Sequence, residues 1–527
     1  MTLAFSFPSG SLAEIEEHVT RWRANNTVAR IWNKDPTVWA DPPVPEIADR
    51  LGWLDAPSTS RELVEPISRL HATAVSNGIT DIVLCGMGGS SLAPEVYATT
   101  LPPAEGSPRL TVMDSTHPDA VRAVSGATEP ETTWYLIASK SGGTVETMSL
   151  YRFFWQQASH ALPDAGNHFI AITDPGTSLE HLAAERGFRA TVLADPEVGG
   201  RYSALTAFGL VPAGLIGADV AALLDTAGGI AKLCGPDTRL EENPGFRIGA
   251  LLAERALSGR DKAQFVASTP TEAVGIWIEQ LIAESTGKHG VGIIPIDGGP
   301  LLDGSPASTI VGIGATPPDD ADIRITVEHP HDLAAVMFVL EFATATAGEI
   351  LGINPFDQPD VQLAKQLASR AMQGELESSG VAPTDVADSP WVESLSDALE
   401  TLTPSYISIQ AYIPQTPDNT SRLDVLRRKL SEAAGVYATI GFGPRFLHST
   451  GQIHKGGPPG GIYLQIIDDT GGTLDVPGAG YTFNELIAGQ ARGDRAALAD
   501  RDRTVIAVDL GRDRLSGLDS MVEQVDG

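Results

Sequence analysis

The chain has 527 residues, of which 42% are hydrophobic and 20% charged, as expected of a globular protein with two or three domains. It has 36 Lys and Arg against 67 Asp and Glu, a formal net charge of −31. This charge argues against nucleic acid or an anionic membrane as a partner, but allows a small anion bound in a local pocket. The two cysteines and the N-terminus, which lacks a signal-peptide pattern, predict a cytoplasmic protein.

Residues 1–75 are predicted to be a helical N-terminal segment interrupted by prolines. From residue 76, short apolar runs alternate with helical patterns. The runs are DIVLCGM, RLTVMD, TWYLIAS, HFIAITD and ATVLAD. Such alternation predicts βαβ units, in which helices cover both faces of a parallel sheet. We place this first α/β domain at residues 76–215.

A helical bridge is expected over residues 216–259, followed by a second α/β domain over 260–375. Its predicted strands are AQFVAST, GVGIIPID and DIRITVE, and its predicted helices are 271–284, 331–350 and 359–374. The stretch 298–321 is rich in Gly, Pro and Asp and is predicted to be a loop. Residues 376–527 contain three more apolar runs, SYISIQAYI, GIYLQIID and TVIAVDLG. We therefore expect a folded C-terminal extension that packs on the site.

A glycine-rich turn, VLCGMGGSSLAPEV, joins the first predicted strand to a helix at residues 83–96. Glycines let the backbone approach a ligand closely, and the start of a helix presents free N–H groups to an anion. Ser91 stands where the G-x-G-x-x-G pattern of dinucleotide-binding proteins needs glycine, so that function is disfavoured. The alternative is an ordinary tight turn.

A second turn, YLIASKSGGTVETMSLY, follows another strand at residues 135–151. It places Lys140 among the hydroxyl groups of Ser139, Ser141 and Thr144, just before a helix. A cation, several donors and a helix N-terminus together favour a bound phosphate. The P-loop pattern is absent, which disfavours a nucleoside triphosphate. The alternative is simple helix capping.

Two charged residues stand out in the next segments. Arg201 follows two glycines in PEVGGRYSALTAFGL, and is either directed into a cleft or a surface residue. Glu284 lies in the last turn of the mostly apolar helix in TEAVGIWIEQLIAESTGKHG. A partly buried carboxylate there suits a general base. The alternative for Glu284 is a surface ion pair with Lys288, four residues later.

The segment NPFDQPDVQLAKQL begins a predicted helix at residues 354–367. Gln358 and Lys365 are two helical turns apart and therefore share a face. They either face the same ligand or are ordinary polar residues of a surface helix.

These five stretches, in this order, resemble the glucose-6-phosphate isomerase (phosphoglucose isomerase) family. The shared motifs are G-x-G-G-S, S-K-[ST]-x-x-T, GGRYS, E-S-x-G-K and F-D-Q-x-x-V-x-x-x-K, over residues 86–365. The resemblance implies two doubly wound, parallel-sheet sugar-isomerase (SIS) domains. It also implies reversible isomerisation of glucose 6-phosphate and fructose 6-phosphate, by ring opening and cis-enediol proton transfer, without a metal or other cofactor.

The resemblance also implies roles for individual residues. Those that would hold the sugar and its phosphate are Gly89, Ser90, Ser139, Lys140, Ser141, Thr144 and Gln358. Arg201 would stabilise the enediolate, Glu284 would move the proton between C2 and C1, and Lys365 would assist ring opening.

The family uses a histidine for ring opening between the Glu and F-D-Q motifs, and this chain has no histidine over residues 291–314. The C-terminal segment GFGPRFLHSTGQIHKGGPPGG resembles the isomerase half of bacterial transaldolase–isomerase fusion proteins, and it contains His448 and His454. Either could transfer a proton near neutral pH. The alternative is a structural turn with a hydrogen-bonded histidine.

Two other functions stay open at this point. The protein could isomerise another sugar phosphate, such as mannose 6-phosphate, or sense a sugar phosphate without catalysis. Glu284, Arg201 and Lys365 argue against a sensor, because binding alone does not need a base. The expected partner is a small sugar phosphate, and the family resemblance favours a homodimer.

Overall fold

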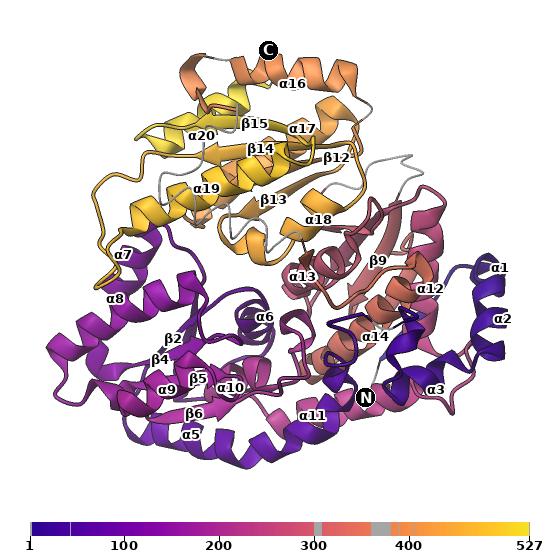
Figure 1. Ribbon diagram of the computed structural model, residues 1–527, viewed down its shortest axis with the longest axis horizontal. Coiled ribbons are helices and arrows are strands. Elements are labelled where there is room, and N and C mark those ends of the chain that lie inside the picture. The colour runs from indigo at the N-terminus through magenta and orange to yellow at the C-terminus, as the bar shows by residue number, and fades with distance from the viewer. Residues whose placement is uncertain are drawn as a thin grey trace.

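The computed structural model describes residues 3–42, 44–299, 308–359, 381–388, 390–402 and 404–525. Within these residues the chain forms three five-stranded sheets, each at the centre of an α/β unit. Figure 1 shows the first unit in purple, the second in pink to salmon and the third in orange to yellow. The three units contact one another around the middle of the molecule.

The first unit has an all-parallel sheet with the order β3-β2-β4-β5-β6. Its strands are β2 (Asp81–Gly86), β3 (Arg109–Met113), β4 (Thr133–Ala138), β5 (Phe169–Thr173) and β6 (Ala190–Leu193). Its helices are α6 (Leu92–Thr100), α7 (Pro118–Ala127), α8 (Val145–Ala161) and α9 (Ser178–Glu185). The inner strands β2 and β4 are buried along their whole length, as helices on both faces require. The predicted parallel-sheet fold is confirmed here.

The second unit has four parallel strands: β7 (Lys262–Ala267), β8 (Ile294–Asp297), β9 (Ser308–Gly314) and β10 (Ile323–Thr326). Its helices include α11 (Val220–Leu233), α12 (Pro244–Leu257), α13 (Val274–Thr286) and α14 (Leu333–Leu351). Helix α10 (Ala207–Leu215) precedes them and packs against α6 of the first unit. The prediction of a loop over 298–321 is wrong for β9. That strand is the apolar run STIVGIG, which glycine-rich and acidic sequence surrounds on both sides. The predicted helix 359–374 lies outside the described residues after Pro359.

The N-terminal segment packs against the second unit, except for its last helix, Val64–Ser76, which packs against α10. It contains α1 (Ser11–Glu14), α2 (Glu16–Ala24), α3 (Thr27–Trp32), α4 (Ala56–Thr59) and α5 (Val64–Ser76). It also contributes β1 (Ala4–Ser6), which pairs antiparallel with β10 at the edge of the second sheet. The prediction of a helical segment did not include this strand. Trp39 anchors the segment, because its indole N–H donates to the Ala345 carbonyl at 2.9 Å.

Helix α14 is long and apolar enough to cross a membrane, but 89% of its apolar window is buried inside the protein. It packs against α11, α12 and α13. Its composition is therefore that of a central core helix.

The C-terminal region is a third parallel α/β unit with its own hydrophobic core. Its strands are β11 (Thr384–Asp385), β12 (Tyr406–Ala411), β13 (Ala438–Phe442), β14 (Gly461–Ile467) and β15 (Thr504–Asp509). Its helices are α16 (Pro390–Thr401), α17 (Pro417–Ala434), α18 (Gly451–Gly456), α19 (Phe483–Ala499) and α20 (Arg514–Gln524). The three apolar runs seen in the sequence are β12, β14 and β15.

All three sheets share one strand order. If the four consecutive parallel strands of each unit are numbered along the chain, their order is 2-1-3-4: β3-β2-β4-β5, β8-β7-β9-β10 and β13-β12-β14-β15. In each sheet a fifth strand lies beside the fourth: β6, β1 and β11. In such sheets the loops after strands one and three meet at the topological switch point, where ligands bind.

Candidate active site

The predicted phosphate loop lies at the switch point of the first sheet, between the end of β4 and the start of α8. Gly142 turns the chain with φ 70°, and Ser139 Oγ lies 2.9 Å from Thr144 Oγ1. Lys140 Nζ lies 2.6 Å from Asp174 Oδ2, so Asp174 neutralises this cation in the structure. Ser141 is exposed at the tip. The loop thus gathers hydroxyls and one cation at the start of a 17-residue helix.

The glycine residues in the turn after β2 allow this turn to contact the backbone of two other segments closely. A Cβ atom on Gly89 would lie 1.9 Å from the Gly200 carbonyl oxygen, so only glycine fits there. Gly88 has φ 56°, and a Cβ atom on it would lie 2.7 Å from the carbonyl oxygen of His448. Ser90, next in the turn, is buried. This turn therefore brings the G-G-R-Y-S segment and the third unit together.

Arg201 and Glu284 form a buried ion pair beside this turn. Their side chains are only 3% and 6% exposed, with Arg201 Nη1 3.4 Å from Glu284 Oε1. Arg201 Nε also donates to Ser285 Oγ at 2.8 Å, and Glu284 Oε2 accepts from Gln280 Nε2 at 3.1 Å. The alternative of a surface arginine is therefore wrong.

Lys288 is also buried and does not form the surface pair with Glu284. Its Nζ lies 2.8 Å from Asp357 Oδ1 and also donates to the Asn354 carbonyl. Burial, and next the nearby charge of Arg201, lower the pKa of Lys288 to about 7. Arg201 Nη2 donates to the Asp357 carbonyl at 2.9 Å. Two cations thus fix the chain immediately before the half-buried Gln358. Lys365 lies outside the described residues.

His448 comes from the third unit and reaches this site. It lies in the short helix Arg445–His448, and its Nε2 is 3.0 Å from Glu146 Oε1. Gln490 Nε2 donates to the same Glu146 oxygen at 2.7 Å. The His448 carbonyl accepts from Gln280 Nε2 at 2.8 Å, and Gln280 also contacts Glu284. One amide therefore joins the His448 segment to the buried carboxylate.

His454 lies elsewhere, inside the third unit. Its imidazole packs among the rings of Tyr406, Phe446 and Tyr463, and its Nδ1 lies 3.1 Å from Gln410 Nε2. Burial is the main reason that the pKa of His454 falls well below its ordinary value. The structure therefore does not bring His454 together with the other candidate residues.

Sequence reasoning did not single out Glu146, Gln280 or Gln490. Two of them carried a weak signal, because Glu146 lies in the first turn after the phosphate loop and Gln280 lies one turn before Glu284. Gln490 carried no such signal, because its partner Glu146 lies 344 residues away in the sequence.

Comparison with known proteins indicates the kind of enzyme. The family model for phosphoglucose isomerase matches residues 60–292. The glucose-6-phosphate isomerase of Rubrobacter xylanophilus is 28% identical over 434 residues, which cover 70% of this chain and 98% of that protein. The protein is a sugar-phosphate isomerase. A second relative, the glucose-6-phosphate isomerase of a Cyanothece species, is 32% identical over 266 residues, 45% of this isomerase and 49% of the relative.

Solved structures support the fold of the isomerase. A hypothetical protein from Thermus thermophilus has a TM-score of 0.60 at 23% identity, over 70% of this chain and 99% of that one. A glucose-6-phosphate isomerase from Chlamydia trachomatis has a TM-score of 0.56 at 19% identity, over 75% and 92%. The family match ends at residue 292, so the third unit lies beyond it.

Proposed function

We propose that the isomerase interconverts glucose 6-phosphate and fructose 6-phosphate by ring opening and proton transfer through a cis-enediol. The observation that supports this most is the link from Glu284 through Gln280 to the backbone of His448. This link joins the Glu284 carboxylate to the backbone of the residue that carries the imidazole, and a carboxylate and an imidazole are both suited to proton transfer. Arg201 adds a fixed positive charge beside the carboxylate.

The 6-phosphate would bind in the loop of Ser139, Lys140, Ser141 and Thr144. A phosphate there would compete with Asp174 for Lys140 and gain the free N–H groups at the start of α8. This binding energy lies away from the reacting carbons, so it can position C1 and C2. Gly89, Ser90 and Gln358 would line the sugar.

Ring opening needs a proton donor for the ring oxygen and an acceptor for the C1 or C2 hydroxyl proton. His448 would serve here, with its imidazole oriented by the Glu146 carboxylate 3.0 Å away. Lys365 would assist. This role for His448 supplies the proton-transfer group that the segment 291–314 lacks.

Glu284 would then take the proton from C2 and return it to C1, or the reverse. Negative charge develops on the enediolate oxygen during this transfer, and the guanidinium of Arg201 is already fixed in a buried site to stabilise it. Both steps move protons only, so the proposed reaction is balanced without an oxidant or reductant.

The test is a coupled assay. Purified protein receives fructose 6-phosphate, and a glucose-6-phosphate dehydrogenase reports the product as NADPH. We expect robust turnover with fructose 6-phosphate. Faster turnover with mannose 6-phosphate, measured in parallel with an added glucose-6-phosphate isomerase that converts the fructose 6-phosphate product for the dehydrogenase, would assign the site to that sugar. Binding without turnover of either sugar would support the sensor. The cytoplasmic location, the homodimer and the relation to transaldolase fusions stay predictions.

A further inference from the structure

The third unit repeats a loop of the first. The third strand of the first sheet is followed by S-G-G-T at residues 141–144, and the third strand of the last sheet is followed by T-G-G-T at 470–473. The first glycine of each pair has a positive φ, 70° at Gly142 and 65° at Gly471. With the shared strand order, this points to a repeated unit with a corresponding ligand loop.

The fourth strands show the same correspondence. Asp174-Pro175-Gly176 follows β5, and Asp509-Leu510-Gly511 begins at the last residue of β15. Gly176 and Gly511 have φ values of 77° and 67°, and a helix begins shortly after each. Both loops therefore turn in the same way at the same place in the strand order.

The charge of the repeated loop is reversed. The first unit has Ser139 and Lys140 before its S-G-G-T, whereas the third has Asp468 and Asp469 before its T-G-G-T. Two carboxylates in place of a hydroxyl and a cation repel a phosphate. The loop after β14 is therefore unsuited to the anion that its counterpart would bind.

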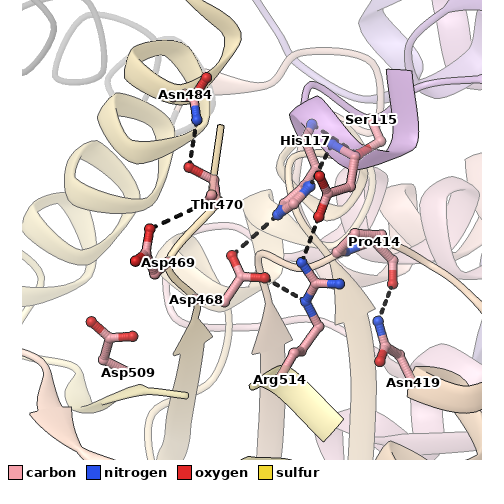
Figure 2. A network of polar contacts seen from close by, with 12 residues as sticks. Ser115, His117, Pro414, Asn419, Asp468, Asp469, Thr470, Asn484, Asp509 and Arg514 are labelled. Carbon is pink, nitrogen blue, oxygen red and sulfur yellow. Dashed lines mark hydrogen bonds and ion pairs between the residues drawn. The ribbon is translucent and has the colours of Figure 1, made fainter. Parts of the chain in front are cut away.

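Asp468 instead binds the first unit, as Figure 2 shows. Its Oδ1 lies 3.1 Å from His117 Nε2, and the two side chains are 1% and 0% exposed. His117 Nδ1 accepts the backbone N–H of Asp119, so Nε2 carries the proton and donates to Asp468. Arg514 joins the two units again, contacting Asp468 and lying 2.9 Å from Asp119 Oδ2.

This contact is connected to the His448 site. The residue before His117, the buried Thr116, donates its hydroxyl to Gln490 Oε1 at 2.7 Å. Gln490 Nε2 in turn donates to Glu146, the carboxylate that holds His448. Three hydrogen bonds through α19 and α8 thus join Thr116, the neighbour of His117, to the His448 imidazole.

We propose that the third unit is a repeat of the first whose ligand loop has exchanged phosphate binding for docking, and that the His117–Asp468 contact positions His448 over the site. The positioning role rests on the proposed function of His448. Asp468 and His117 are positioning residues in this account, because neither touches the reacting atoms.

The test uses the intact protein and three variants. Asp468→Asn removes the negative charge that His117 and Arg514 share, and His117→Gln removes the imidazole from the other unit. Asp469→Asn is the matched control, since Asp469 is the next residue and its side chain contacts the exposed Arg512 and the backbone N–H of Gly471 in its own loop, not the first unit. We expect turnover of fructose 6-phosphate to fall about 100-fold in both docking variants, as for a misplaced catalytic group, with KM changed less than about twofold. The double variant is expected to be no worse than either single one.

Titration with 6-phosphogluconate, which has no ring to open, counts the phosphate sites. One site per chain is expected, whereas a second site that responds to Asp468→Asn would overturn the loss of phosphate binding.

Equal turnover in Asp468→Asn and Asp469→Asn would overturn the positioning role. Hydrogen exchange gives a readout that does not need activity: residues 443–456 should lose protection in both docking variants and keep it in the control. If the wild type lacks turnover, unchanged protection overturns the docking, and lost protection supports it while the proposed function fails.

Discussion

At the scale of single residues, Arg201 and Glu284 are two opposite charges held almost without contact to water. Burying such charges is costly, and the cost is offset only when the remaining hydrogen-bonding atoms find partners. Ser285 and Gln280 supply them. The motifs in the sequence singled out both charges. They did not predict Gln280, because an ordinary glutamine in an apolar helix gives no signal of its contacts.

Glu284→Gln is expected to fold normally and to lower kcat by roughly 10²–10⁴-fold, because glutamine keeps the shape but cannot accept the C2 proton. Steady-state kinetics and a thermal melt of the same preparations measure this. The matched control is Glu272→Gln, an exposed glutamate in the loop before α13, which should keep wild-type kcat. Wild-type turnover in Glu284→Gln would rule out this base.

Lys288 should make stability depend on pH. Its pKa is about 7 in the folded protein and 10.5 ordinarily, so between these values the unfolded chain binds a proton that the native state lacks. The free energy of unfolding should then rise with pH from 7 to 9, by up to about 1.4 kcal/mol per unit. Lys288→Gln should lose this increase, whereas Lys232→Gln, at an exposed position, should keep it. Urea titrations at several pH values measure both, and equal slopes in the wild type and Lys288→Gln would contradict the burial argument.

At the scale of elements, the site depends on turns that meet one another. The sequence predicted the strand–turn–helix order of the first unit correctly, because buried parallel strands are apolar runs. It suggested that glycines in the turn after β2 approach a ligand. The structure adds a second reason, since Gly89 meets the backbone of Gly200. Strand β9 was missed because its seven residues lie within glycine-rich and acidic sequence, where composition favours a loop.

Gly89→Ala should force the turn after β2 away from the turn that contains Gly200 and Arg201, because the added Cβ atom would lie 1.9 Å from the Gly200 carbonyl oxygen. We expect destabilisation of about 1–3 kcal/mol and a fall in kcat/KM. Gly228→Ala is the control, since it lies within α11 with no atom within 4 Å of its added Cβ. A denaturation curve and a kinetic assay measure the two effects. Full activity in Gly89→Ala would show that the turns need not touch.

At the scale of the whole molecule, the third unit is held to the first by ion pairs that are largely shielded from water. Arg445 Nη2 lies 2.6 Å from Glu95 Oε2, and its Nε lies 2.8 Å from Asp114 Oδ2. Burial raises the pKa of Glu95 against the opposing effect of Arg445. The sequence predicted a folded C-terminal extension near the site. Its docking could not be predicted, because partners such as Arg445 and Glu95 lie 350 residues apart and no local pattern records that contact.

Arg445→Met should leave the buried Asp114 and the partly buried Glu95 without this partner and lower the free energy of unfolding by about 1–3 kcal/mol. Because Arg445 is three residues before His448, turnover should fall as well. Arg428→Met replaces an exposed arginine of α17 and should change stability by less than about 0.5 kcal/mol. Urea denaturation compares them, and equal midpoints for the two variants would show that the Arg445 ion pairs do not hold the units together.

The central claim is proton transfer by Glu284 through an enediol, and the most direct measurement is isomerisation in D2O followed by NMR. Fructose 6-phosphate should give glucose 6-phosphate that carries deuterium at C2, because the proton that Glu284 takes from the sugar exchanges with D2O over repeated turnovers. Glu284→Gln should form product and incorporate deuterium at least about 100-fold more slowly, while Glu272→Gln should match the wild type. Product formed without deuterium after long incubation, or deuterium incorporated by Glu284→Gln at the wild-type rate, would contradict the account.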